Sequence, residues 1–201
     1  VLVNRGYQEV ITYSFISNEY HDLIDPSAKK ITLKNPISDD MSIMRSSLWP
    51  GLLQTVEMNL RRGHHNTRFF ETGLCFSGIS VDDQRQKIAG IICGERFKSQ
   101  WGSPEREVDF FDAKSDVESL LSLSGNDYIF EAAEHPALQA GQAAKISNNG
   151  QLVGWIGALS PHLQKKLSLP KLFLFELNQS DIEQRKVSSY ESFSSFQSSQ
   201  R

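Results

Sequence analysis

The sequence predicts an α+β fold in which helices flank a mostly antiparallel sheet. Two strand-like segments, 142–147 and 151–159, are joined by an Asn-Asn-Gly turn at 148–150, which is a strong β-hairpin signal. Two further strand-like segments, 67–76 and 87–93, lie on either side of a polar connection. Helical segments fall between these hairpins instead of alternating with every strand. This distribution favours α+β over a parallel α/β arrangement.

Composition places the chain among ordinary globular proteins. With 201 residues and 39% apolar content, it can bury a substantial core. Its 21 Lys and Arg residues are balanced by 24 Asp and Glu residues, for a formal charge of -3, which argues against strong independent nucleic-acid binding. We find no membrane-spanning run and no secretory signature, so we expect a cytoplasmic location without membrane contact. Cys75 and Cys93 lie in apolar runs, which predicts buried, reduced thiols.

Short elements are expected in the first part of the chain. They are a helical turn at 1–5, a strand at 10–15, a helix at 17–24 and a strand at 31–33. Gly6 supplies the C-terminal stop of the turn, and β-branched and aromatic residues favour the first strand. Ser17 can cap the helix, and Pro26 follows its end. An irregular stretch then runs to about Arg45.

The best-marked helix begins at Pro50 and closes at residues 61–63. Its apolar stripe consists of Leu52, Leu53, Val56 and Leu60. This stripe is a candidate subunit interface, and packing on the chain's own sheet is the equally open alternative. Trp101, in the charged and irregular segment 95–109, is a further interface candidate.

The second half continues with a helix capped by Asp112 and carrying Val117 and Leu120. The elements expected after it are strands at 128–131, 142–147, 151–159 and 172–177, and a helix at 160–167. Residues 188–201 contain seven serines, a composition typical of a linker. We therefore expect a core domain at 1–187 and a Ser-rich linker at 188–201.

The chemically informative segments are the run 44–53 and the strand that contains Glu71-Thr72-Gly73. Their order resembles the class II aminoacyl-tRNA synthetases, in which a Leu-Arg segment precedes a helix, and a Glu-Ile-Gly strand runs into motif 2, Phe-Arg-x-Glu. The resemblance places that tetrad on residues 76–79, so Ser77 stands at the arginine position and Ile79 at the acid position. Amino-acid activation needs a guanidinium on the ATP α-phosphate, where negative charge develops. The resemblance therefore implies a noncatalytic class II scaffold.

The candidate for motif 3 of the class is the glycine-rich segment 154–162, which has a strand-to-helix junction. In the class this motif carries a second ATP-binding arginine, and no arginine occurs here before Arg185. We expect no catalytic, cofactor-binding or metal-binding residues in this chain.

Further stretches extend the resemblance along nearly the whole chain. They are Arg5 to Phe15, Asn35 to Ser38 with Met41-Ser42, Met44 to Leu53, and His135 to Leu138 with Gly141 to Ala144. In this order they are similar to the core of the phenylalanyl-tRNA synthetase beta subunit. The resemblance implies a heterotetramer of two alpha and two beta subunits, in which the alpha subunit binds ATP and phenylalanine. ATP, magnesium and tRNA then belong to the holoenzyme, and this core alone is inactive.

Other interpretations stay open at this point. Arg61, Arg62, His64 and Arg68 could contact RNA or a partner, or could form a solvated loop. Arg45 could contact phosphate or pair with a carboxylate, and Glu71 could accept hydrogen bonds from the backbone or from Arg68. The alternative functions are a free-standing adenylate-forming enzyme of class II type and a tRNA-contacting module.

Overall fold

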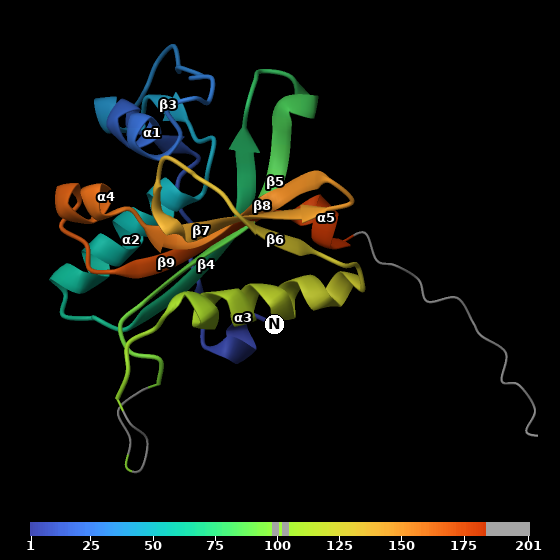
Figure 1. The fold of residues 1–201 in the computed structure, drawn as a ribbon. Coiled ribbons are helices and arrows are strands. Elements are labelled where there is room, and N and C mark those ends of the chain that lie inside the picture. The colour runs from blue at the N-terminus through green and yellow to red at the C-terminus, as the bar shows by residue number, and fades with distance from the viewer. Residues whose placement is uncertain (98–100, 102–104, 184–201) are drawn as a thin grey trace, which may run out of the picture.

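The computed structural model describes residues 1–97, 101 and 105–183. A seven-stranded sheet has the order β1-β4-β5-β9-β8-β7-β6 and forms the centre of the molecule (Figure 1). Its strands are β1 (Gln8–Glu9), β4 (Thr67–Phe76), β5 (Gln84–Cys93), β6 (Ile129–Ala132), β7 (Leu138–Asn148), β8 (Gln151–Leu159) and β9 (Leu172–Asn178). All neighbours pair antiparallel except β1 with β4. The predicted fold class is confirmed.

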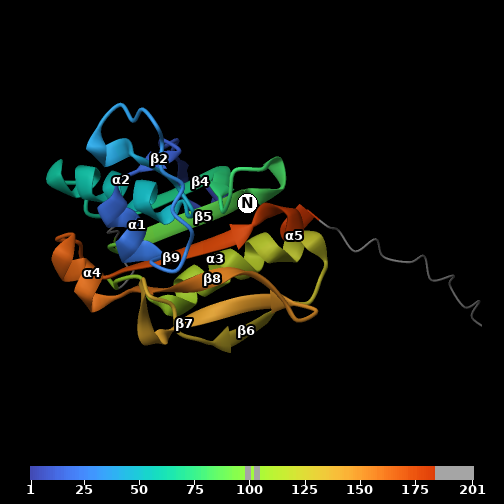
Figure 2. The same ribbon diagram turned by 90° about the horizontal axis from the view of Figure 1, so that it is seen from above.

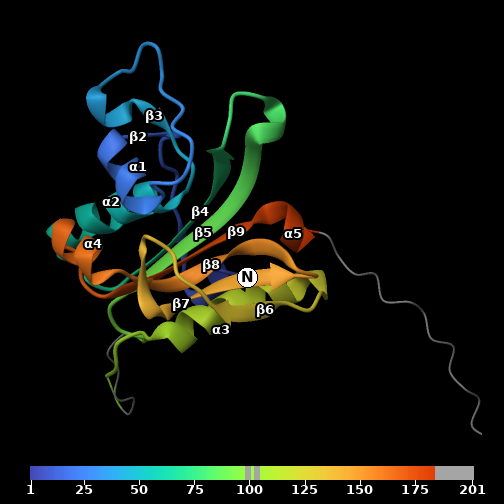
Figure 3. The ribbon, with the colours of Figure 1, turned by 45° about the horizontal axis from the view of Figure 1, so that its top comes forward.

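Helices cover both faces of this sheet (Figures 2 and 3). The α-helices are α1 (Asn18–Ile24), α2 (Trp49–Arg61), α3 (Phe110–Leu121), α4 (Pro161–Lys166) and α5 (Gln179–Glu183). Short 3-10 turns are η1 (Val3–Arg5), η2 (Asp39–Met41), η3 (Val81–Asp83) and η4 (Ser122–Ser124). Among the described residues, no helix has the length and apolar character needed to cross a membrane.

The core has two halves because side chains alternate across the sheet. On β9, Phe173 and Phe175 pack in the half that contains α3, with Val117 among their neighbours. Leu172 and Leu174 belong to the other half, which contains α1, α2 and α4. The central strand β9 is therefore buried on both sides, which explains its almost continuous apolar sequence.

The predicted hairpin between β7 and β8 is confirmed. Asn148 pairs with Gln151, and Asn149 and Gly150 have φ values of 50° and 79°. Asparagine and glycine tolerate this left-handed region best, so the sequence selects a tight turn at this point. The predicted burial of Cys75 and Cys93 as free thiols is also confirmed.

Two predicted strands in the N-terminal part are wrong. Of the segment 10–15, only Phe15 is in a strand, as the first residue of β2 (Phe15–Ile16), which pairs with β3 (Ile43–Met44). After β1, the chain stays beside β4 as far as Val10, whose amide donates to the carbonyl of Phe70. It reaches the two-stranded sheet at Ser14, whose carbonyl accepts from the amide of Arg45. The segment 31–33 forms only an isolated bridge at Thr32.

The N-cap of α3 differs from the predicted one. Asp109 accepts a hydrogen bond from the amide of Asp112 (2.9 Å), and the Asp112 carboxylate accepts from the amide of Asp109 (3.0 Å). The helix thus begins with a capping box, in which Asp112 is the third helical residue. Either aspartate of an Asp-x-x-Asp sequence can cap, and the structure selects the first.

The predicted interface stripe on α2 is wrong for three of its four residues. Leu52, Leu53 and Val56 are each 0% exposed and pack on the chain's own sheet. Leu60 is half-buried against the same core. The helix is amphipathic as predicted, and its apolar side packs within the chain, which was the alternative interpretation. Trp101 is fully exposed.

Candidate functional site

The tetrad at the motif 2 position lies at the outer end of the β4–β5 hairpin. Phe76 is the last residue of β4, where it pairs with Gln84 of β5. The Ser77 hydroxyl donates to the backbone carbonyl of Asp83 (3.1 Å), and Ile79 is 86% exposed. Neither of these two side chains is a cation, so positions 77 and 79 supply no bidentate donor to a phosphate. The arginine of the hairpin nearest to them in sequence is Arg85, which is exposed and pairs with Cys75 across the two strands.

A buried ion pair joins Arg45 to Glu71 of β4. The Nη1 atom of Arg45 donates to Oε1 of Glu71 (2.7 Å) and to Oγ1 of Thr12 (3.1 Å). The Glu71 carboxylate also accepts from the amide and hydroxyl of Thr12, at 3.2 Å and 2.7 Å. Both charges are thus satisfied inside the protein. The interpretation of Arg45 as a structural residue paired with a carboxylate is confirmed, whereas Arg68 is not the partner of Glu71.

Close packing requires a glycine at position 73, two residues after Glu71. A Cβ atom at Gly73 would overlap the guanidinium of Arg45 and press on Leu48. The Nε atom of Arg45 donates to the carbonyl of Leu74 (3.0 Å), which fixes the guanidinium over this glycine. The Glu-Thr-Gly sequence therefore holds an arginine inside the fold.

A second buried network covers the next two strands on the same face. The Glu176 carboxylate on β9 accepts from the Ser47 hydroxyl (2.8 Å), the Leu48 amide (2.7 Å) and Nζ of Lys87 (2.6 Å). Burial opposes the charge on Lys87, but Glu176 outweighs it and raises the pKa of the lysine. The indole of Trp49 donates to the carbonyl of Phe175 (3.0 Å). These contacts fasten the start of α2 to the sheet.

These two networks decide whether ATP fits this chain. Glu71 and Cys75 point to the α2 face, so a side chain at position 77 would continue on that face. There, a nucleotide would have to displace the Arg45–Glu71 pair, the Glu176 network and the buried Trp49. Removing one partner from a buried charge pair is costly. Arg45 and Lys87 are committed to internal carboxylates, so the buried part of this face does not fit a nucleotide.

The predicted motif 3 candidate is misplaced. Gly154 pairs with Leu177, and Lys87 pairs with Asn178, so the start of β8 lies at the hairpin end of the sheet. The junction of β8 with α4, at Ser160, therefore lies at the opposite end from residues 76–79. The strand-to-helix junction at the same end as residues 76–79 joins β9 to α5. The first arginine after it in the sequence is Arg185, which lies outside the described residues.

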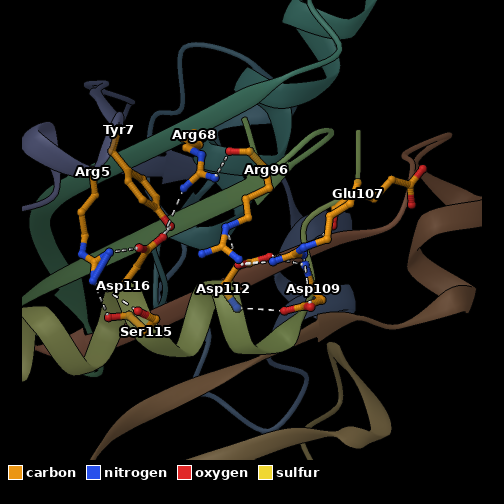
Figure 4. A network of polar contacts seen from close by, with 10 residues as sticks. Arg5, Tyr7, Arg68, Arg96, Glu107, Asp109, Asp112, Ser115 and Asp116 are labelled. Atoms are coloured by element: carbon orange, nitrogen blue, oxygen red, sulfur yellow. Dashed lines mark hydrogen bonds and ion pairs between the residues drawn. The ribbon is translucent and has the colours of Figure 1, made fainter. Parts of the chain in front are cut away.

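A polar network at the β1 edge lines a groove of about 890 Å³ (Figure 4). Asp116 of α3 accepts from the Tyr7 hydroxyl (2.9 Å) and pairs with Arg5 (3.0 Å) and Arg68 (3.4 Å). Burial raises the pKa of Asp116 even though these three groups oppose it. Burial, followed by the charge of Asp116, likewise raises the pKa of Tyr7. Arg5, Tyr7 and Arg68 thus satisfy the Asp116 carboxylate from within the protein.

The structure separates the predicted basic cluster. Arg61 pairs with Glu57 (2.5 Å) and lines a second cavity of about 460 Å³ with Lys166. His64 and Arg68 line the groove at the β1 edge instead. Arg62 is exposed. Within the ranges 1–97, 101 and 105–183, no group of three or more His, Cys, Asp or Glu residues could hold a metal ion.

Sequence reasoning missed Glu176 and Asp116. Each leaves a recognisable signal, because Glu176 interrupts an apolar strand and Asp116 lies next to Val117 on the buried side of α3. A charged residue at a core position predicts a buried partner. The sequence does not show which residue that partner is.

Comparison with known proteins supports the class II architecture. A pyrrolysyl tRNA synthetase from Desulfitobacterium hafniense superposes with a TM-score of 0.64 over 90% of this chain and 63% of its own, at 13% identity. At this identity the likeness shows the fold alone.

Sequence comparison identifies the family as well as the fold. The chain is 47% identical to the phenylalanine–tRNA ligase beta subunit of Nitrosococcus oceani over 98% of its length, and 46% identical to that of Pseudomonas putida over 100%. It spans 25% and 26% of those two relatives. The family model for the phenylalanyl tRNA synthetase beta chain CLM domain matches residues 1–179. The chain therefore belongs to the phenylalanyl-tRNA synthetase beta chain family.

Proposed function

We propose that this chain is the noncatalytic core module of a phenylalanyl-tRNA synthetase beta subunit. In this role it pairs with the catalytic alpha subunit, and the holoenzyme attaches phenylalanine to its tRNA. The observation that carries the proposal is the α2 face of the sheet, where the Arg45–Glu71 and Lys87–Glu176 pairs take the place of phosphate-binding cations. The class II scaffold is kept, and its nucleotide face has become core.

The partners and cofactors follow from this role. The alpha subunit binds ATP and phenylalanine, and magnesium belongs to the holoenzyme. Two alpha and two beta subunits assemble in the cytoplasm, and tRNA is bound through the holoenzyme. The expected core domain at 1–187 and Ser-rich linker at 188–201 remain part of this proposal, and residues 184–201 lie outside the described residues. Arg5 and Arg68 pair with the buried Asp116, which supports a structural role for them over tRNA contact.

Co-purification tests this proposal directly. The beta chain, expressed with its alpha subunit and purified through a tag on the beta chain, is expected to carry the alpha subunit in equal amount. Pyrophosphate exchange dependent on phenylalanine is expected from the complex and absent from the beta chain alone. A beta chain that purifies without alpha subunit, or that exchanges pyrophosphate by itself, would contradict the proposal.

A further inference from the structure

The β4–β5 hairpin extends beyond its neighbours in the sheet. The two strands pair as far as Phe76 and Gln84, whereas β9 pairs with β5 only from Lys87 onward. On the other side, β1 reaches only Phe70 of β4. The turn at 77–83, here called the hairpin tip, therefore projects from the molecule, as the upper end of β4 and β5 in Figure 1 shows.

The hairpin tip is held in one conformation by Asp83. Its carboxylate accepts from the amide and the hydroxyl of Ser80, at 3.1 Å and 2.9 Å. Its backbone carbonyl accepts from the amide of Ser77 (2.9 Å). Gly78 lies against the same carboxylate, where a Cβ atom would overlap it. Hydrogen bonding to Ser80 lowers the pKa of Asp83, so this arrangement persists at neutral pH.

This fixed turn presents two apolar side chains to solvent. Ile79 is 86% exposed and Val81 is 81% exposed. Apolar side chains on a preorganised turn lose little conformational entropy on binding, which is the condition under which a small contact becomes strong. Neither side chain contributes to the core, so folding does not require these residue types.

The charges around these side chains indicate the kind of partner. Asp82 and Asp83 are the ionisable residues of the hairpin tip, and both are acidic. Lys29 acts on Asp83, and Arg85 follows in β5, which leaves Asp82 as the uncompensated charge of the tip. An acidic side chain disfavours a phosphate backbone, and the tip has no aromatic ring on which a base could stack. An apolar pocket with a basic rim on a protein would complement it.

We propose that the hairpin tip inserts Ile79 and Val81 into an apolar pocket with a basic rim on the catalytic alpha subunit. This inference rests on the proposed function, because it assigns a contact within that subunit pairing. The hairpin would thus have exchanged the binding of a nucleotide phosphate for the binding of a protein.

Site-specific crosslinking in the assembled enzyme identifies the occupant. The photoreactive amino acid p-benzoylphenylalanine replaces Ile79 in the beta chain, which is co-expressed with the alpha subunit and irradiated with and without tRNA. The matched control carries it at Ile129, a 58% exposed residue of β6 at the other edge of the sheet. Crosslinking to the alpha subunit from position 79 and not from 129 is expected. A crosslink from position 79 to tRNA or to the beta chain alone, or no crosslink, overturns the inference.

Substitution tests whether the contact contributes to affinity. The double variant Ile79→Asp, Val81→Asp is expected to weaken association with the alpha subunit by about tenfold or more, whereas Ile129→Asp leaves it unchanged. Both variants should unfold at the wild-type temperature, because these positions are exposed. Equal affinity of wild type and double variant would overturn the hairpin contact alone. Failure of the wild-type chain to bind would instead overturn the proposed function.

Discussion

At the scale of single residues, the Arg45–Glu71 pair is the main feature of the α2 face of the sheet, where we expect a catalytic relative to bind its nucleotide. The two side chains are 5% and 3% exposed and share Thr12 as a common hydrogen-bond partner. The sequence indicated that Arg45 pairs with a carboxylate, and it left the backbone or Arg68 as the partner of Glu71. Residues 68 and 71 are three positions apart on one strand, so their side chains lie on opposite faces. Alternation along a strand excludes that pair, and only the fold supplies the correct partner.

This pair predicts a large effect on stability. Glu71→Gln leaves the guanidinium of Arg45 buried without its charge partner, and we expect a loss of about 3–5 kcal/mol in the free energy of unfolding. Glu57→Gln, which breaks the exposed pair with Arg61, should cost less than about 1 kcal/mol. Urea denaturation of both variants measures the difference. Similar losses for the two would show that the buried pair does not stabilise the fold as described.

At the scale of elements, the sequence predicts whether a helix or strand exists better than it predicts what that element packs against. The stripe on α2 is amphipathic, but hydrophobic spacing does not distinguish a partner subunit from the chain's own sheet. The segment 10–15 has strand composition, yet it spans the gap between two sheets, and Ile11 is 93% exposed there. The start of α3 was missed by three residues because two aspartates compete for the cap. In the first two cases a long-range contact decides what local sequence leaves open, whereas the cap of α3 is decided between two aspartates that are three residues apart.

The capping box of α3 predicts a dependence of stability on pH. Burial works against the charge on Asp112, but hydrogen bonds from Arg106 and the Asp109 amide prevail and lower its pKa below the usual 3.8. A lowered pKa in the folded state stabilises the protein fully above pH 3.8, and this contribution is lost as the pH falls through the folded-state value. Asp112→Asn should therefore lose less stability than the wild type between pH 6 and pH 3.

The measurement for this prediction is the urea midpoint at the two pH values. Glu118→Gln, on the exposed side of the same helix, serves as the control and should follow the wild type. If Asp112→Asn loses as much stability as the wild type on acidification, the carboxylate does not stabilise the folded state in the way its contacts indicate.

At the scale of the whole molecule, the strand order decides which residues share a face. Three features were predicted from local sequence patterns. They are the fold class, the β7–β8 hairpin and the absence of cations at positions 77 and 79. Sequence reasoning assigned motif 3 to the segment before α4, because glycines and a strand-to-helix junction occur there. The sheet places that junction at the end away from the hairpin tip. Such an error cannot be detected without knowing that β9 lies between β5 and β8.

The central claim is that this chain keeps a nucleotide-activating fold whose nucleotide face is filled by its own buried ion pairs. Isothermal titration calorimetry of the purified chain with ATP and magnesium tests it most directly. The structure predicts no binding heat beyond dilution, with or without phenylalanine. Saturable binding of ATP with micromolar affinity would contradict it.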